Sequence, residues 1–328
     1  MKLSLLETLH CPVTRQKLHI ENIQDVDNDE LVNGYLVSED NLHKYQVINS
    51  IPRFVPKENY ADNFGMQWNY FRKTQLDSFS GQSISADRFW GATKWKPEDI
   101  KDKWVLDAGC GSGRFAEIAL KAGAKVIALD YSSAVDACYE NLKHYPNLHV
   151  VQGDIYSLPF NSGSFPFIYS LGVLQHTPDV EMSFISLVEV LAKNGSICVD
   201  FYWKRMQTMI HMKYLLRPIT KQINHQKMFK IVSNIVPKLL PISNALIRIP
   251  IIGKPLSRLI PVANYSTTFG LPIEQQIQWS ILDTFDWFSP RYDNPQNVKT
   301  IRKWCEKNNI KKIEIFHHGH LVAKGNKL

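Results

Sequence analysis

The stretch that decides the fold reads Asp107-Ala-Gly109-Cys110-Gly111-Ser-Gly113. An apolar run at 103–108 leads into it, and a helical pattern begins directly after it at Arg114. Glycines between a strand and a helix allow a tight turn, and they let a ligand approach the backbone without meeting a Cβ atom. We therefore expect a strand, a ligand-binding loop and a helix in this order.

Two further acids follow the next two apolar runs. Asp130 ends the run 125–130, and Asp154 follows the run 149–152. In a parallel sheet both would lie on the same rim as the glycine loop, where Asp130 could accept hydrogen bonds from both hydroxyls of a ribose and Asp154 could meet an adenine edge. The glycine spacing is GxGxG, whereas nucleotide-dependent hydride enzymes use GxGxxG. The pattern predicts a site for a nucleoside-containing ligand.

The same alternation of strands and helices continues outward from the loop. Continuous apolar runs are typical of strands buried on both faces, which predicts an α/β fold with a parallel sheet and helices on either side. A C-terminal helix at 298–308 precedes two strands joined at Gly319, and we expect this hairpin to close the sheet. The expected strands are 103–108, 125–130, 149–152, 167–171, 196–202, 310–317 and 320–324, and the expected helices among the first of them are 114–122 and 133–145.

Several of these motifs resemble class I S-adenosylmethionine-dependent methyltransferases. The resemblance covers about residues 101–200 and rests on the glycine loop, Asp130 with Ser132, Asp154, Leu158-Pro-Phe160 and Gly172-Val-Leu-Gln-His176-Thr-Pro-Asp179. Phe64-Gly-Met-Gln67-Trp68, Ser133-Ala-Val-Asp136 and Phe285-Asp286-Trp-Phe-Ser-Pro290-Arg291-Tyr292 resemble a bacterial subgroup of small-molecule methyltransferases. The family implies a Rossmann-like sheet of seven strands with a reversed terminal hairpin.

The resemblance also implies the cofactor, S-adenosyl-L-methionine, with S-adenosyl-L-homocysteine as product and no metal. Glycines 109, 111 and 113 would surround its methionine part, Asp130 its ribose, and Asp154 with Ile155 its adenine. One departure is Pro166, which stands where the family commonly has Asp; a strand entrance needs no ladder donor and tolerates proline. The cofactor residues implied are Asp107, Gly109, Cys110, Gly111, Gly113, Asp130, Tyr131, Asp154, Ile155 and Leu171.

His176 is the candidate catalytic residue. It follows the fourth strand near the expected transfer point, and histidine is the side chain that titrates nearest neutral pH. The alternative is that it caps the next helix or lines the cofactor pocket. Residues 170–173 do not form the (N/D)PPY turn of the best-known amide and nucleobase N-methylating families, which argues against those families and leaves oxygen, carbon and other nitrogen acceptors open. Candidate acceptor-pocket residues are Tyr202, Trp203, Trp287, Arg291 and Tyr292.

The N-terminal segment resembles small zinc-ribbon domains of the tRNA-methyltransferase-activator type. In those domains a CPxC knuckle pairs with a second CxxC. Here Cys11-Pro12-Val-Thr14 has lost its second cysteine, and 38–42 supplies none. We expect a ribbon that folds without metal.

A basic stretch without any acid lies between Phe201 and Ile273. It carries a net charge of +11, whereas the rest of the chain is acidic. One side of a predicted helix in this stretch is apolar, with Met228, Ile231, Val232, Ile235, Val236 and Leu239. The opposite side of the same helix carries Lys227, Lys230, Asn234 and Lys238. Three interpretations of this stretch are open: a packed surface helix, an element that contacts an anionic membrane or a lipid acceptor, and a nucleic-acid site. The third is disfavoured, because the stretch has few aromatic side chains on which bases could stack.

These observations divide the chain into five parts: a ribbon-like segment (1–56), a linker with an aromatic-rich helical region (57–100), the cofactor-binding core (101–203), a basic helical insert or lid (204–275) and the C-terminal part of the core (276–328). Five scattered cysteines without a CxxC pair, no export signal and no apolar 18-residue window predict a cytoplasmic protein, with peripheral membrane contact left open.

The expected function is methyl transfer to a small-molecule or lipid-like acceptor, on oxygen. The alternatives are an RNA- or protein-modifying methyltransferase and a non-catalytic cofactor-binding regulator. Oligomeric state does not follow from the sequence.

Overall fold

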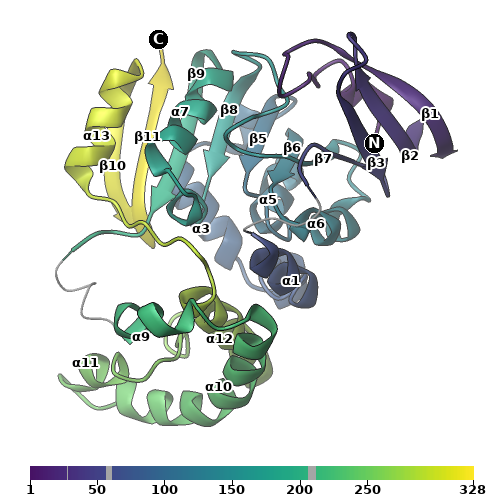
Figure 1. Ribbon diagram of the computed structural model, residues 1–328. Helices are drawn as coiled ribbons and strands as arrows, with labels where there is room; N and C mark the ends of the chain where they lie inside the picture. Colours follow the sequence, from purple (N-terminus) through teal and green to yellow (C-terminus); the bar gives the residue numbers. More distant parts are fainter. Residues whose placement is uncertain (28, 57–60, 206–211) are drawn as a thin grey trace.

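The computed structural model describes residues 1–27, 29–56, 61–205 and 212–328, and Figure 1 shows a twisted sheet above a lobe of helices. Residues 57–60 of the predicted linker and 206–211 of the predicted insert lie outside the described residues.

Five parallel strands form the centre of the sheet, in the order β7-β6-β5-β8-β9. Beyond β9 the reversed strand β11 and then β10 complete the predicted C-terminal hairpin. A register shift beside Pro166 separates the pairs that Phe165 and Phe167 make with β9, so the proline occupies an irregular point of the ladder. The strands are β5 (Trp104–Ala108), β6 (Lys125–Asp130), β7 (Leu148–Gln152), β8 (Phe165–Ser170), β9 (Leu191–Phe201), β10 (Ile310–His318) and β11 (His320–Lys327), so each expected strand is confirmed.

Helices cover both faces of this sheet because its strands alternate their side chains between two cores. Val105 and Val126 belong to the core beneath α3, α5 and α6, whereas Leu106 and Ile127 belong to the core beneath α7 and α13. The expected helices at 114, 133 and 298 are therefore confirmed. The helices of the two faces are α3 (Ile84–Thr93), α5 (Arg114–Lys121), α6 (Ala134–Leu142), α7 (Val180–Val190) and α13 (Val298–Lys307), with short α2 (Asp77–Ser80) and α4 (Pro97–Ile100) before the sheet.

The prediction of a seven-stranded sheet is wrong, because the described residues form one sheet of eleven strands. The additional strands are the N-terminal meander β1 (Leu18–Asp27), β2 (Glu30–Ser38), β3 (Lys44–Ile48) and β4 (Ile51–Arg53). Strand β6 pairs with one edge of β7 and leaves the other edge free within the parallel core. Strand β4 pairs with this second edge in parallel, at Arg53 and Gln152. Leu5, Leu9 and Leu31 are buried in the same core as Leu106, so the meander shares its apolar interior with the sheet.

The lobe consists of α9 (Met212–Thr220), α10 (His225–Ile247), α11 (Gly253–Ser257) and α12 (Ile273–Phe288). Helix α10 buries Met228, Val232 and Val236 against Phe285 and Phe288 of α12, as its stripe predicts. Ile235 of that stripe is exposed instead. Helix α12 crosses the predicted boundary at 275–276 and packs against α9 and α10. Across the parts of the chain that are described, no helix combines the length and apolarity that a bilayer crossing requires.

Candidate functional site

The glycine loop lies between β5 and α5 and is fixed to the neighbouring strand. The backbone amides of Gly109 and Cys110 donate to the carbonyl of Leu129 at 2.7 and 3.0 Å. Gly109 has φ +91°, and a Cβ there would lie 2.4 Å from Val173; at Gly113 a Cβ would lie 2.6 Å from Leu142. Only glycine satisfies both the backbone angle and the space at these positions.

Asp130 closes this loop from the end of β6. One carboxylate oxygen accepts from the amide of Gly111 at 2.9 Å, and the other accepts from the amide and hydroxyl of Ser132 at 2.9 and 2.7 Å. Burial raises its pKa, while these hydrogen bonds oppose the rise. Asp130 therefore presents a fixed acceptor at the rim of the sheet.

A cavity of about 780 Å³ extends from this loop towards the helical lobe. This volume is within the usual range of ligand pockets, about 300–1,000 Å³. Helix α1 (Asp62–Tyr70) covers the loop, with Trp68 packed over Gly111 and Phe64 further along the wall. Of the predicted cofactor residues, those that line the cavity are Gly109, Cys110, Gly111, Asp130, Tyr131, Ile155 and Leu171.

The remaining predicted cofactor residues lie behind this lining. Asp107 is buried in β5, where burial raises its pKa to about 8, and its Oδ2 has no hydrogen-bond partner among the described residues. Asp154 accepts from the amide of Tyr156 at 2.9 Å, and its neighbour Ile155 lines the cavity. Gly113 begins α5. The role of every predicted cofactor residue, in the lining or behind it, stays a prediction.

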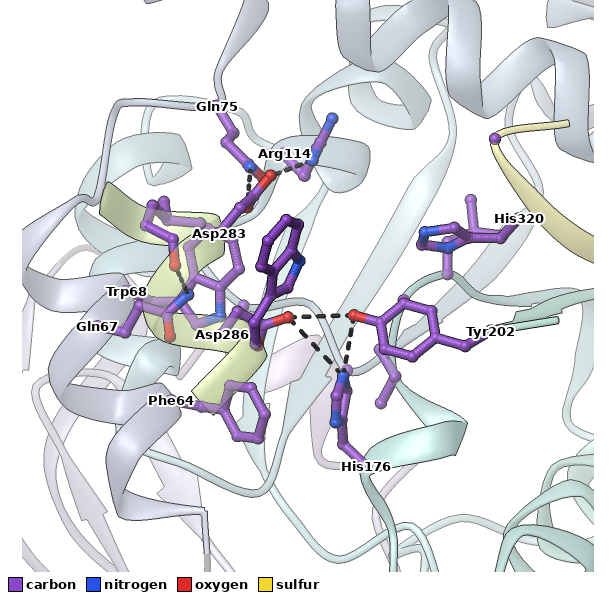
Figure 2. A pocket seen from close by; sticks show the side chains of 18 of the residues that line it. Phe64, Gln67, Trp68, Gln75, Arg114, His176, Tyr202, Asp283, Asp286 and His320 are labelled. Atoms are coloured by element: carbon purple, nitrogen blue, oxygen red, sulfur yellow. Dashed lines mark hydrogen bonds and ion pairs between the residues drawn. The ribbon is translucent and has the colours of Figure 1, made fainter. Parts of the chain in front are cut away.

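His176 ends a short 3-10 helix, Leu174–His176, that follows β8, and it belongs to a hydrogen-bonded array. Its Nδ1 donates to the carbonyl of Tyr292 at 3.0 Å, because a carbonyl can only accept. That leaves Nε2 as an acceptor in the neutral ring, 3.3 Å from the hydroxyl of Tyr202. The same hydroxyl lies 3.1 Å from Oδ2 of Asp286, which is itself 3.9 Å from Nε2 (Figure 2). The three side chains line the cavity together.

A second acid, Asp283, stands one turn before Asp286 on α12. Gln75 donates to it at 3.3 Å, and so does the hydroxyl of Tyr265 at 2.5 Å. Burial raises the pKa of Asp283 to about 6. Arg114, which is hydrogen-bonded to Gln75, supplies a nearby positive charge, and burial lowers its pKa to about 9 (Figure 2).

An ion-pair network supports the wall near the C-terminal hairpin. Arg88 donates to Asp200 at 2.7 Å and contacts Nδ1 of His320 at 3.0 Å, and the amide of Gly172 donates to Asp200. Burial alone would raise the pKa of Asp200, but Arg88 and His320 hold it well below its usual range. Asp200 thereby fixes the loop after β8 to the end of β9.

The predicted acceptor-pocket residues separate into two groups. Tyr202, Trp203 and Trp287 line the cavity. Arg291 is exposed, with its guanidinium 5.5 Å from the ring of Tyr292, and neither residue is part of the lining. Tyr292 reaches the site through its carbonyl, on His176.

Sequence reasoning missed many polar residues of this cavity, and four of them illustrate why. Gln75, Arg88, Arg114 and Asp286 all line it. A signal existed for Asp286, which lies in the quoted 285–292 stretch three residues after Asp283, so that both acids share one helix face. No comparable signal marked Gln75 or Arg88, whose partners lie far away in the sequence.

The part of the chain that is described contains no cluster of three or more His, Cys, Asp or Glu side chains that could hold a metal ion. In the N-terminal segment the thiol of Cys11 contacts the hydroxyl of Tyr45 at 3.2 Å and the amide of Thr14 at 3.4 Å.

Comparison with known proteins identifies the central part of the chain. Residues 106–199 match the family model of the methyltransferase domain. A demethylmenaquinone methyltransferase of Staphylococcus haemolyticus is 30% identical over 117 residues, which cover 32% of this chain and 49% of that protein. A tRNA U34 carboxymethyltransferase of Ruthia magnifica is 28% identical over 130 residues, 36% of this chain and 40% of that protein. The chain thus spans less than half the length of either relative.

Among solved structures, phosphoethanolamine N-methyltransferase 2 of Haemonchus contortus, in complex with phosphomonomethylethanolamine and S-adenosylhomocysteine, matches with a TM-score of 0.46 and 13% identity. That match covers 80% of this chain and 46% of the other.

Proposed function

We propose that this chain, whose residues 106–199 form an S-adenosylmethionine-dependent methyltransferase domain, methylates a hydroxyl group of a small-molecule or lipid-like acceptor. The observation that carries the proposal is the cavity, which joins the glycine loop to the array of His176, Tyr202 and Asp286. The proposed site of the methyl donor and the proposed proton acceptor therefore line the same cavity.

The glycine loop and Asp130 fit the cofactor. The loop leaves no room for a Cβ at Gly109, and Asp130 presents carboxylate oxygens to a ribose at the rim of the sheet. Asp107 adds a buried carboxyl oxygen without a partner among the described residues. When bound, S-adenosylmethionine supplies an electrophilic methyl group on a sulfonium. Transfer then requires mainly that a nucleophile be held in line, and positioning of this kind contributes roughly 7–11 kcal/mol.

His176 is the proposed base. With Nδ1 held by the carbonyl of Tyr292, the lone pair of Nε2 is available for the proton of an acceptor hydroxyl. Tyr202 stays protonated because burial and then Asp286 raise its pKa well above the usual value, so its hydroxyl can donate to Asp286. The carboxylate of Asp286, 3.9 Å from Nε2, stabilises the imidazolium that forms.

The character of the walls supports an apolar or amphipathic acceptor. Trp203, Trp287 and Leu259 line the cavity, together with the cations Arg205 and Arg258. The two curated relatives are named for different acceptors, so the shared domain leaves the choice of acceptor to residues outside it.

The test uses purified protein, methyl-labelled S-adenosylmethionine and a cell extract as the source of acceptor. The label is then partitioned into lipid, small-molecule, RNA and protein fractions, with Asp130→Ala as the control that lacks the cofactor contact. Label in the lipid or small-molecule fraction supports the proposal. Label in RNA or protein instead supports an RNA- or protein-modifying enzyme, and cofactor binding without any label supports a regulatory role.

The base is tested separately once an acceptor is in hand. We expect His176→Ala to lower kcat about 10²- to 10⁴-fold, the range of general-base contributions, with cofactor affinity unchanged. Asp286→Asn should lower kcat less than His176→Ala does, because Asp286 acts through His176 and Tyr202. Full turnover by His176→Ala with cofactor bound would show that the base lies elsewhere.

The N-terminal segment is proposed to be a ribbon-like module without zinc. Cys11 is the one cysteine in 1–56, and its thiol is engaged with Tyr45 and Thr14. Metal analysis that finds about one zinc per chain would contradict this.

A further inference from the structure

The lobe exposes apolar side chains beside the face that it buries. Helix α10 packs Met228, Val232 and Val236 inward. On the adjoining side of the same helix stand Ile235 and Ile242, seven residues apart and 42% and 52% exposed. The apolar stripe of α10 is therefore wider than its contact with α12 requires.

The turn between α10 and α11 is more exposed still. Ile251 is 96% exposed and Ile252 54% exposed, and Ile249 beside them is also exposed. Ile251 has φ +66°, a region that β-branched residues rarely adopt. An isoleucine here gains nothing from burial and strains the backbone, so the fold itself does not explain it.

Positive charge surrounds these isoleucines. No acidic residue lies between Phe201 and Ile273, so no carboxylate of this stretch offsets its cations. We define the lobe surface as the exposed isoleucines 235, 242, 249, 251 and 252 with the exposed cations Lys227, Lys230, Lys238, Arg248 and Lys254. Aliphatic side chains next to cations suit an anionic bilayer, whereas single-stranded nucleic acid requires aromatic side chains for stacking.

The same segment also forms a wall of the cavity. Pro255, Arg258 and Leu259 line the cavity, and Leu259 is exposed as well. Figure 1 shows α10 and α11 at the end of the molecule farthest from the strands. The outer surface of the lobe is thus continuous with the cavity wall.

We propose that the lobe surface docks on an anionic lipid bilayer, so that the cavity takes its acceptor from the membrane as a lipid. The first part of this proposal, docking on the bilayer, depends only on the observations of the lobe surface. The second part, a lipid as methyl acceptor, rests on the proposed function, because it assumes that methyl transfer occurs in the cavity.

Docking is tested by flotation of the full-length chain with vesicles of phosphatidylglycerol and phosphatidylcholine, against vesicles of phosphatidylcholine alone. We expect binding to the anionic vesicles at low ionic strength and its loss at about 1 M salt, where charges are screened beyond about 3 Å. Cofactor affinity, measured by calorimetry in parallel, reports the proposed function independently.

The decisive variant is Ile251→Ser with Ile252→Ser, and its matched control is Ile23→Ser with Val26→Ser on β1, at the opposite edge of the sheet from the hairpin. Ile23 and Val26 are exposed apolar residues of similar size, 63% and 49% exposed. We expect the first variant to lower vesicle partitioning at least about tenfold and the control to leave it unchanged, with cofactor affinity equal in both. Arg248→Glu with Lys254→Glu should abolish the preference for anionic vesicles.

The opposite results are equally distinct. No flotation at low ionic strength with the cofactor bound, equal binding to both vesicle types, or equal loss in the control variant would overturn docking. So would a stronger preference for RNA, or a dimer that dissociates in the Ile251→Ser, Ile252→Ser variant. Label confined to water-soluble acceptors would overturn the lipid acceptor, while failure of cofactor binding would overturn the proposed function and leave the flotation result standing.

Discussion

At the scale of single residues, the proposed cofactor site depends on backbone geometry and the proposed acceptor site on side-chain protons. Gly109 and Gly113 are required by positive φ and by the neighbours that a Cβ would meet. His176 depends on one proton fixed at Nδ1 by a carbonyl and on one hydroxyl near Nε2. These two sites therefore respond to different substitutions.

Alanine substitutions at Gly109 and Gly81 separate the cost of a strained backbone angle from the cost of steric overlap by the added Cβ. Gly109→Ala should destabilise the fold and weaken cofactor binding about tenfold or more, because its Cβ would lie 2.4 Å from Val173. Gly81→Ala has a similar backbone angle, φ +69°, with nothing within 4 Å, and should cost only about 1–2 kcal/mol of strain. Denaturant unfolding and calorimetry of both variants measure the difference, and equal effects would show that the overlap is relieved.

The buried carboxyl of Asp107 gives a pH prediction. Its pKa is about 8 in the folded chain, against about 3.9 when unfolded, so between these values the folded state holds a proton that the unfolded state releases. The free energy of unfolding without cofactor should therefore fall as pH rises from about 4 to 8, by up to about 1.4 kcal/mol per pH unit. Asp107→Asn should remove this slope, and a variant with the wild-type slope would contradict it.

At the scale of elements, the junction between β4 and β7 joins the N-terminal meander to the core. One register pair connects these strands, and Arg53 reinforces it by donating to Gln152 at 2.8 Å and pairing with Asp136 at 2.6 Å. The amide of Phe54 adds a hydrogen bond to the carbonyl of Gln152. A short strand with few ladder bonds thus depends on one side chain.

Removal of this side chain should weaken the junction. Arg53→Ala should lower the free energy of unfolding by about 1–3 kcal/mol and increase hydrogen exchange in β1–β4, because it breaks two charged or polar bonds in a partly buried setting. Lys44→Ala, which breaks an exposed pair with Glu21, should cost clearly less than Arg53→Ala, because solvent screens an exposed pair. Equal losses in the two variants would mean that Arg53 is not the reinforcement.

At the scale of the whole molecule, the cavity connects the sheet to the helical lobe. Gln67 of α1 donates to the carbonyl of Leu282 in α12, and Gln75, in the turn between α1 and α2, donates to the carboxylate of Asp283. Arg114 at the start of α5 lies 5.6 Å from the ring of Trp279. A ligand in the cavity is therefore in contact with both parts.

Cofactor should consequently stabilise the chain as a unit. At a concentration of 100 Kd, S-adenosylmethionine should add about 2.7 kcal/mol to the free energy of unfolding and raise Tm in thermal scans. Asp130→Ala, which removes the proposed acceptor for the ribose, should abolish the shift at the same concentration. A shift of equal size in that variant would place the cofactor elsewhere.

The sequence by itself determined the parallel core, the terminal hairpin and the glycine loop with Asp130 at its rim. These follow from local patterns: apolar runs set the strands, and glycine alone fits the turn before Arg114. Tertiary structure decided the rest. Strand β4 extended the sheet because an open edge of β7 was available to it. Asp286 came to Tyr202 across 84 residues because α12 packs into the lobe. The local hydrophobic pattern of the sequence does not predict this contact, since the contact depends on how whole helices pack.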